Sequence, residues 1–243
     1  MGAVMEARCE FFTVAFCDQS FINWAGWASV LGCFLICYYG ARHISGHPRH
    51  YAVLALFATA WVLVLGAINS RINMPLETVL PDRAQDVASL LLVYAGAMLA
   101  REAPAQHWIV GAQRWLQVAG LWLMFLLVLP DQVHARLQLS PQRAQLFLGE
   151  VLGYAAYLSL ALGARVAASS KIFVLLAATL VAYTGIGLAR TVELWFVTGT
   201  RPYIGPGFAY AYIAARLATT ALFTYIVVKH AETQTAASAS ARA

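Results

Sequence analysis

The stretch GFAYAYIAARLATTALFTYIVV, residues 207–228, carries one formal charge, that of Arg216, among apolar and small side chains. A helix needs about 20 consecutive, mostly apolar residues to cross the hydrocarbon core of a bilayer. Six stretches of similar character precede this one, near residues 21–41, 51–70, 84–100, 113–130, 145–164 and 172–197. The sequence therefore predicts an all-α, multi-pass membrane protein built as a bundle of seven transmembrane helices.

The composition of the whole chain supports this prediction. Of the 243 residues, 61% are hydrophobic and 11% are charged, whereas about 25% of the residues in an ordinary soluble domain are charged. Such a chain has too little polar surface to cover a water-soluble globule of this size. The lipid bilayer is the expected partner, and nucleic acid is not.

Three segments are expected along the chain. Residues 1–20 carry three acidic side chains, whereas a cleaved signal peptide has a basic start and an early apolar core, so the first apolar stretch is expected to be an uncleaved anchor. Residues 21–230 are expected to form the transmembrane domain. Residues 231–243 are rich in Ala, Ser and Thr and are predicted to form a disordered tail.

The Lys and Arg residues outside the predicted helix interiors suggest an orientation, because cytoplasmic connections are enriched in them. One side of the membrane carries eight of them: Arg42, Arg49, Arg101, Arg114, Arg165, Lys171, Lys229 and Arg242. The other side carries six: Arg8, Arg71, Arg83, Arg136, Arg143 and Arg201. We therefore expect an outside or luminal N-terminus and a cytosolic C-terminus. On the luminal side, a disulfide between Cys9 and Cys17 is allowed.

The connection after the first stretch places three histidines, His43, His47 and His50, within eight residues. Iron enzymes that act on lipids use several such clusters, and the other histidines, including His230, stand apart in the sequence. No histidine falls within a predicted span, so the paired axial ligands of a membrane haem are missing from the sequence. We expect no metal and no cofactor, and we interpret the connection as a basic loop at the lipid headgroups.

Charged side chains within the spans are the main functional signal, because each costs ~2.5 to 3.5 kcal/mol at a helix centre on insertion scales. They are Asp86, Glu150, Arg190, Glu193 and Arg216. With alternating helix directions, all five belong to the outer or central part of the bundle. Arg190 and Glu193 are three residues apart and are expected to pair, which makes Glu150 the expected partner of Arg216. The pattern fits a ligand or proton site and, alternatively, a structural ion-pair network.

Aromatic residues occur at the same level of the predicted bundle. They are Trp122, Phe125, Tyr154, Tyr157, Tyr183, Trp195, Tyr210 and Tyr212. Aromatic rings beside a buried acid suit an enzyme that generates carbocations, because a ring face stabilises a cation placed over it. The same rings would equally suit a pocket for a flat, apolar ligand.

The segment Arg83-Ala-Gln-Asp86 is similar to the Arg-x-x-Asp that opens the third helix of microbial rhodopsins, and Arg216 stands where that family carries the lysine that binds retinal. A Schiff base needs an amine. The only lysines of the chain, Lys171 and Lys229, lie at the ends of predicted helices. A covalent retinal chromophore is therefore excluded.

The chain also resembles the fungal integral-membrane terpene cyclases of meroterpenoid and indole-diterpene pathways, which are seven-helix proteins of nearly this size. The resemblance covers Gly26-Trp27, Tyr51 to Trp61, Ala103-Pro104 to Gln113-Arg114, and Phe147 to Trp195. It implies a non-redox, metal-independent cyclase of secondary metabolism.

Two positions depart from the pattern of that family. A Glu follows the helix 2 Trp in the family, and an Asp lies in helix 7, both acting in acid catalysis. Here Val62 follows Trp61, and helix 7 offers Arg216 and no acid. The resemblance then implies that the proton donor has moved to Glu150 or Glu193, either of which can stay protonated in an apolar pocket.

These observations predict an integral-membrane cyclase or isomerase that acts by acid catalysis on an apolar, polyprenyl-like or lipidic substrate. Glu150 and Glu193 are the predicted acids. The predicted substrate-binding residues are Asp86, Tyr154, Tyr157, Tyr183, Arg190, Trp195, Tyr212 and Arg216. The alternative is a transporter or sensor that binds a small ligand through a buried Glu and Arg network. A scaffold subunit with no small-molecule site also fits the sequence.

Overall fold

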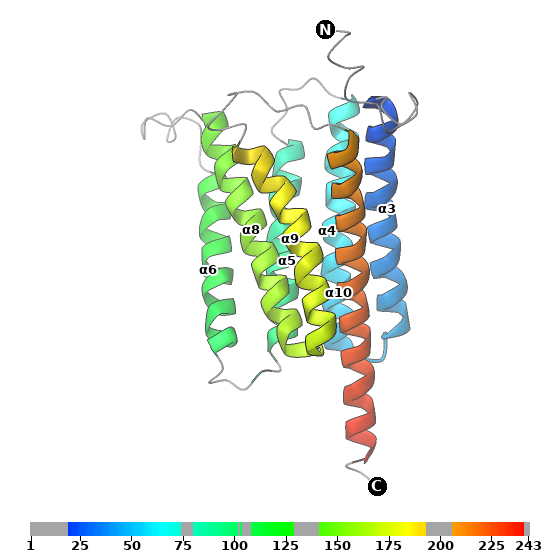
Figure 1. Cartoon of the computed structure of the whole chain (residues 1–243). Coiled ribbons are helices and arrows are strands. Elements are labelled where there is room, and N and C mark those ends of the chain that lie inside the picture. The colour runs from blue at the N-terminus through cyan, green and yellow to red at the C-terminus, as the bar shows by residue number, and fades with distance from the viewer. Residues whose placement is uncertain are drawn as a thin grey trace.

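The structure, a computed structural model, describes residues 19–73, 80–101, 103, 108–128, 141–192 and 206–240. These residues form seven α-helices and no strand (Figure 1). The helices are α3 (Gln19–His43), α4 (Pro48–Asn73), α5 (Leu80–Ala100), α6 (Trp108–Val128), α8 (Pro141–Ala167), α9 (Ser170–Val192) and α10 (Pro206–Ser240). The prediction of an all-helical chain is confirmed.

Five helical segments are long and apolar enough to cross a membrane: Trp24–His43, Pro48–Ala67, Trp108–Val128, Phe147–Ala167 and Ala209–Ser238. Helix α9 contributes a shorter apolar segment, Ser170–Ile186. Helix α5 packs against α4, α6 and α8, so most of its surface faces protein rather than lipid. The chain is therefore consistent with an integral, multi-pass membrane protein.

Helices that follow one another in the sequence run in opposite directions, so that α3 begins and α10 ends at opposite ends of the bundle (Figure 1). Helix α10 packs between α3 and α9, and α5 packs between α4 and α8. Helix α6 lies at the outside of the bundle, against α5 and α8. This order of neighbours determines which polar side chains can meet.

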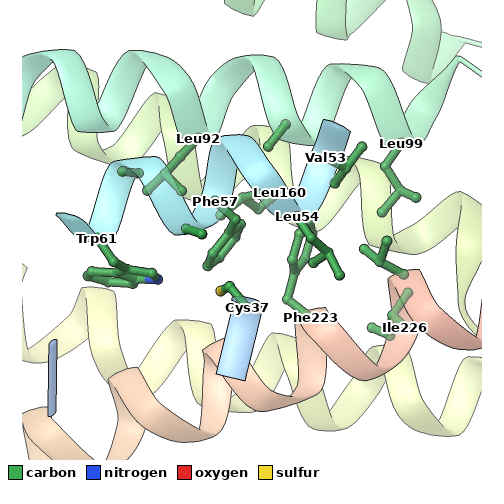
Figure 2. Packing of buried hydrophobic residues seen from close by; sticks show 14 of the residues in the cluster. Cys37, Val53, Leu54, Phe57, Trp61, Leu92, Leu99, Leu160, Phe223 and Ile226 are labelled. Carbon is green, nitrogen blue, oxygen red and sulfur yellow. The ribbon is translucent and has the colours of Figure 1, made fainter. Parts of the chain in front are cut away.

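The core lies where α3, α4, α5, α8 and α10 meet, and Figure 2 shows the side chains that fill it. The rings of Phe57 on α4 and Phe223 on α10 stack with their centroids 4.6 Å apart. Cys37 of α3 packs beside them and is a free, buried thiol. Lipid tails are as apolar as these side chains, so close packing rather than a hydrophobic driving force holds such helices together.

Two glycines allow the close crossing of α5 and α8. A Cβ atom added at Gly96 or at Gly163 would lie less than 3.0 Å from the backbone of the facing helix. Beside them, the buried Ser159 hydroxyl donates a hydrogen bond of 2.7 Å to the Val93 carbonyl. The amide of Gln113 on α6 donates a hydrogen bond of 2.7 Å to the Ser159 carbonyl. Hydrogen bonds thus join α5, α6 and α8 beside the contact of small residues, a combination that is common between membrane helices.

The C-terminal segment differs from its prediction. A helix was expected to end near residue 228, with a disordered tail from 231, whereas α10 continues to Ser240. The Lys229 ammonium lies 2.7 Å from the Glu232 carboxylate one turn away, an ion pair that supports a helix. The imidazole of His43 lies 3.3 Å from the same carboxylate. Alanine, frequent in this segment, has the highest helix propensity of all residues. The segment therefore forms a helix although its hydrophobicity is low.

We predict that Gly163→Ala lowers the free energy of unfolding by about 1 to 3 kcal/mol, because the added methyl group forces α5 and α8 apart. The matched control is Gly153→Ala on the same helix, where a Cβ atom would meet nothing within 4 Å. This control should be neutral or stabilising by up to about 1 kcal/mol. Denaturant unfolding in detergent micelles measures both. Equal stability of the two variants would contradict the close crossing.

Candidate functional site

Arg216 lies about three turns into α10, and 8% of its surface is exposed. Its Nη2 donates a hydrogen bond of 3.0 Å to the carbonyl of Gly26 on α3 and a second, short one to the Ser29 hydroxyl. The Ser29 hydroxyl in turn donates to the Gly26 carbonyl at 2.6 Å. The guanidinium is therefore held against α3 by neutral oxygens.

Two aromatic rings lie beside this guanidinium. Its Cζ atom is 5.8 Å from the ring centroid of Trp61 on α4 and 5.6 Å from that of Tyr212 on α10. A cation within about 6 Å of an aromatic ring centroid is attracted by about 0.5 to 2 kcal/mol. The rings therefore offset part of the cost of burying the charge, but they do not neutralise it.

Arg216 forms no ion pair with an acid of the described part of the chain. The ion pairs among these residues are Arg83–Asp86 at 3.6 Å and two pairs at Glu232, near the exposed end of α10. The expected pair between Arg216 and Glu150 is not formed. Glu150 is on α8, where its side chain is exposed, and α9 packs against both α8 and α10. Helix α10 instead meets α3, which supplies Ser29.

Three buried polar atoms near Arg216 have no hydrogen-bond partner among the described residues: the Nε of Arg216, the indole Nε1 of Trp61 and the Oγ1 of Thr219. All three residues are at least nine-tenths buried. A buried donor without an acceptor costs about 1 to 3 kcal/mol. The site therefore combines a positive charge with donors that a further acceptor could satisfy.

A cluster of tyrosines adjoins Arg216. The Tyr212 hydroxyl donates a hydrogen bond of 2.8 Å to the Tyr183 hydroxyl on α9, and the two rings stack with centroids 4.5 Å apart. The ring of Tyr157 on α8 meets that of Tyr183 edge to face at 5.0 Å. Three of the predicted substrate-binding tyrosines thus come together from three helices. Tyr154 lies on α8 nearly one turn before Tyr157.

Asp86 is buried near the start of α5 and forms its ion pair with Arg83, as the Arg-x-x-Asp spacing suggests. It packs against α8, where a Cβ atom at Gly149 would lie 3.0 Å from its Oδ1. Helix α8 continues with Glu150, whose side chain is exposed. Asp86 is therefore an acid already paired with a cation of its own helix.

The remaining predicted residues divide into two groups. Glu193 and Trp195 lie outside the described residues, as does the side chain of Arg190. Trp122 and Phe125 are 61% and 56% exposed on α6, so these two rings face outward rather than toward Arg216.

Sequence reasoning did not single out Ser29, Trp61 or Thr219 as site residues. Trp61 entered only through the family resemblance, and Ser29 is an isolated hydroxyl in an apolar stretch. The structure adds them because α3, α4 and α10 pack side by side. A small polar residue within a spanning helix, at the same membrane depth as a buried charge, is the signal that could have revealed Ser29.

The histidines at the other end of the bundle are closer together than the sequence suggested. The ring of His230 on α10 lies 5.3 Å from that of His50 on α4, between centroids, and the His47 imidazole lies 2.9 Å from the Thr235 hydroxyl. No group of three or more His, Cys, Asp or Glu side chains within the described segments could hold a metal ion. These contacts tie the α3–α4 connection to α10.

A groove of about 640 Å³ lies between α3 and α4 and is lined by Trp24, Trp27, Ala28, Leu31, Val62, Leu65 and Gly66. Its α3 residues lie on the side of that helix opposite Gly26 and Ser29, given the helical period. The groove is therefore separated from Arg216 by α3, and its apolar lining suits contact with lipid chains.

Comparison of the chain with models of known protein families, with curated proteins and with solved structures finds no match. Assignment of a function therefore depends on the chemistry of Arg216 and its neighbours.

We predict that Arg216→Met leaves the free energy of unfolding unchanged or raises it by up to about 3 kcal/mol, because an apolar side chain removes the cost of a buried charge that has no ion pair among the described residues. The control is Arg165→Met, an exposed arginine over the Phe173 ring, where a loss of about 0.5 to 1 kcal/mol is expected. Unfolding in detergent micelles measures both. A loss of more than about 2 kcal/mol in Arg216→Met would assign this arginine a structural role instead.

Proposed function

We propose that the chain is an integral membrane protein with seven spans that binds a small anionic molecule within its helix bundle, as a carrier or a receptor. The observation that carries this proposal is the burial of Arg216 without an ion pair to any described acid. An ionisable side chain inside a membrane protein marks a functional site by default.

The charge of Arg216 supports an anionic ligand over a neutral one. Arginine carries a positive charge, so a ligand at this site meets a cation. Two opposite charges 4 Å apart attract by about 4 kcal/mol at an effective dielectric constant of 20. Neutral oxygens of Ser29 and Gly26 position the guanidinium while leaving its charge available.

The alternating helix directions support seven spans. Helices α5 and α9 are long enough, and they lie alongside the five apolar segments in the bundle (Figure 1). The ends of the bundle then differ in charge, with more Lys and Arg on the side of the α3–α4 connection. We propose that this side is cytosolic.

An acid-catalysed cyclase has less support from the geometry. Such an enzyme needs a protonated acid facing an aromatic pocket. Asp86 is paired with Arg83, the Glu150 side chain is exposed, and Glu193 lies outside the described residues. The charge beside the rings of Trp61 and Tyr212 is a guanidinium, which cannot donate its proton.

Orientation is tested with fusions to the C-terminus of the full chain. A green fluorescent protein joined after residue 243 should fluoresce, because it folds in the cytosol, and an alkaline phosphatase at the same place should be inactive. The reverse result would contradict an odd number of spans with an outside N-terminus.

Ligand binding is tested by thermal unfolding of the purified protein with four matched compounds: benzoate, phenyl phosphate, benzamide and benzylamine. At a concentration of 100 times the Kd, a ligand stabilises a protein by about 2.7 kcal/mol. We expect at least one of the two anions to raise the Tm of the native chain and to leave the Tm of Arg216→Met unchanged. Benzamide and benzylamine should have no effect.

Equal effects of all four compounds, or an anion effect that persists in Arg216→Met, would contradict an anion site at Arg216. Turnover of an epoxidised prenyl compound by the native chain, lost in Glu150→Gln, would favour the cyclase instead. The exposed Arg165→Met variant serves as the control for the loss of one positive charge.

A further inference from the structure

We infer that the anionic group bound at this site is a carboxylate, held by two N–H donors, Arg216 Nε and Trp61 Nε1. This inference rests on the proposed function and narrows it to one class of ligand, an apolar monocarboxylic acid. The juxtaposition of two buried, unpartnered donors from α10 and α4 is the observation that carries it.

The two donors belong to side chains that lie next to each other. The Trp61 ring centroid is 5.8 Å from the Arg216 Cζ, so the two groups are close enough for one small anion to contact both. Figure 2 shows Trp61 extending from α4 at one end of the core cluster. Both residues are more than nine-tenths buried, so bulk water does not provide the acceptors that these donors need.

The hydrogen bonds already present determine which N–H group of the guanidinium is left for a ligand. Nη2 is engaged by the Gly26 carbonyl and the Ser29 hydroxyl, whereas Nε has no partner among the described residues. A carboxylate presents two acceptor oxygens, and a hydrogen bond from a guanidinium to such an oxygen is charge-assisted. One oxygen on Arg216 Nε and the other on Trp61 Nε1 would satisfy both donors at once.

Charge balance favours a carboxylate over a phosphate monoester. One guanidinium matches one negative charge, whereas a phosphate monoester carries about −1.5 to −2 at neutral pH. The second charge would face the rings of Trp61 and Tyr212, with no further cation among the described residues that contact the Arg216 guanidinium. The walls formed by Trp61 and Tyr212 suit an apolar or aromatic body attached to the carboxylate.

The test uses the full chain, labelled with ¹⁵N and reconstituted in nanodiscs. Benzoate should shift the N–H resonances of the Trp61 indole and the Arg216 Nε, because both donate to it. Trp61→Phe keeps a ring and removes the donor, and it should weaken benzoate binding about ten-fold or more, as expected for loss of a hydrogen bond to a charged group. The matched control is Trp122→Phe on the outer face of α6, which should leave the affinity unchanged.

The outcomes separate this inference from the proposed function. Tighter binding of phenyl phosphate than of benzoate, still lost in Arg216→Met, would overturn the carboxylate and leave an anion site in place. Benzoate binding that shifts other indole resonances, or that is unaffected by Trp61→Phe, would overturn the role of Trp61. Binding of neither anion in an Arg216-dependent way would overturn both proposals.

Discussion

A guanidinium buried in the helix bundle, with no acidic partner among the described residues, is the feature on which the proposed function depends. A charged group in a low-dielectric surrounding is costly unless a counter-charge or several oriented dipoles stabilise it. Arg216 receives two neutral oxygens from α3 and two aromatic faces, from Trp61 and Tyr212. This arrangement keeps the cation in place without neutralising its charge, as the proposed anion site requires.

The helices around Arg216 are held by contacts that do not involve its charge. Thr220 donates a hydrogen bond of 3.3 Å to the sulfur of Cys33, and one turn along, Thr224 lies 3.9 Å from the sulfur of Cys37. These short polar side chains bring α10 close to α3. On the other side of the bundle, Gly96 and Gly163 bring α5 close to α8. The position of Arg216 is therefore set by the packing of α10 against α3 and not by an ion pair among the described residues.

The helices themselves could be predicted from the sequence, because length and apolarity are local properties of each stretch. The gathering of Tyr157, Tyr183 and Tyr212 could also be anticipated, since alternating helix directions place them at one depth. The pairing of Arg216 with Glu150 could not be judged, because it depends on which helices are neighbours. Membrane depth alone does not specify that order, and α10 packs against α3 rather than chiefly against α8.

The C-terminal part of α10 is a second feature that could not be predicted from the sequence. Composition favoured a disordered tail, but α10 continues to Ser240 because the alanines of this segment have high helix propensity and because His43 and His47 provide partners for Glu232 and Thr235. Those partners come from a connection almost 190 residues earlier in the chain. Trp61 was missed in the same way, since nothing in α4 indicates that its indole will meet an arginine of the last helix.

An experimental density map of the protein in lipid, at a resolution that shows ordered small molecules, tests the central claim most directly. We expect density for an acceptor within hydrogen-bonding distance of both Arg216 Nε and Trp61 Nε1, with no carboxylate of the chain nearby. A side-chain carboxylate of Glu150 or Glu193 within 4 Å of the Arg216 guanidinium would contradict it, because the charge would then be paired within the protein.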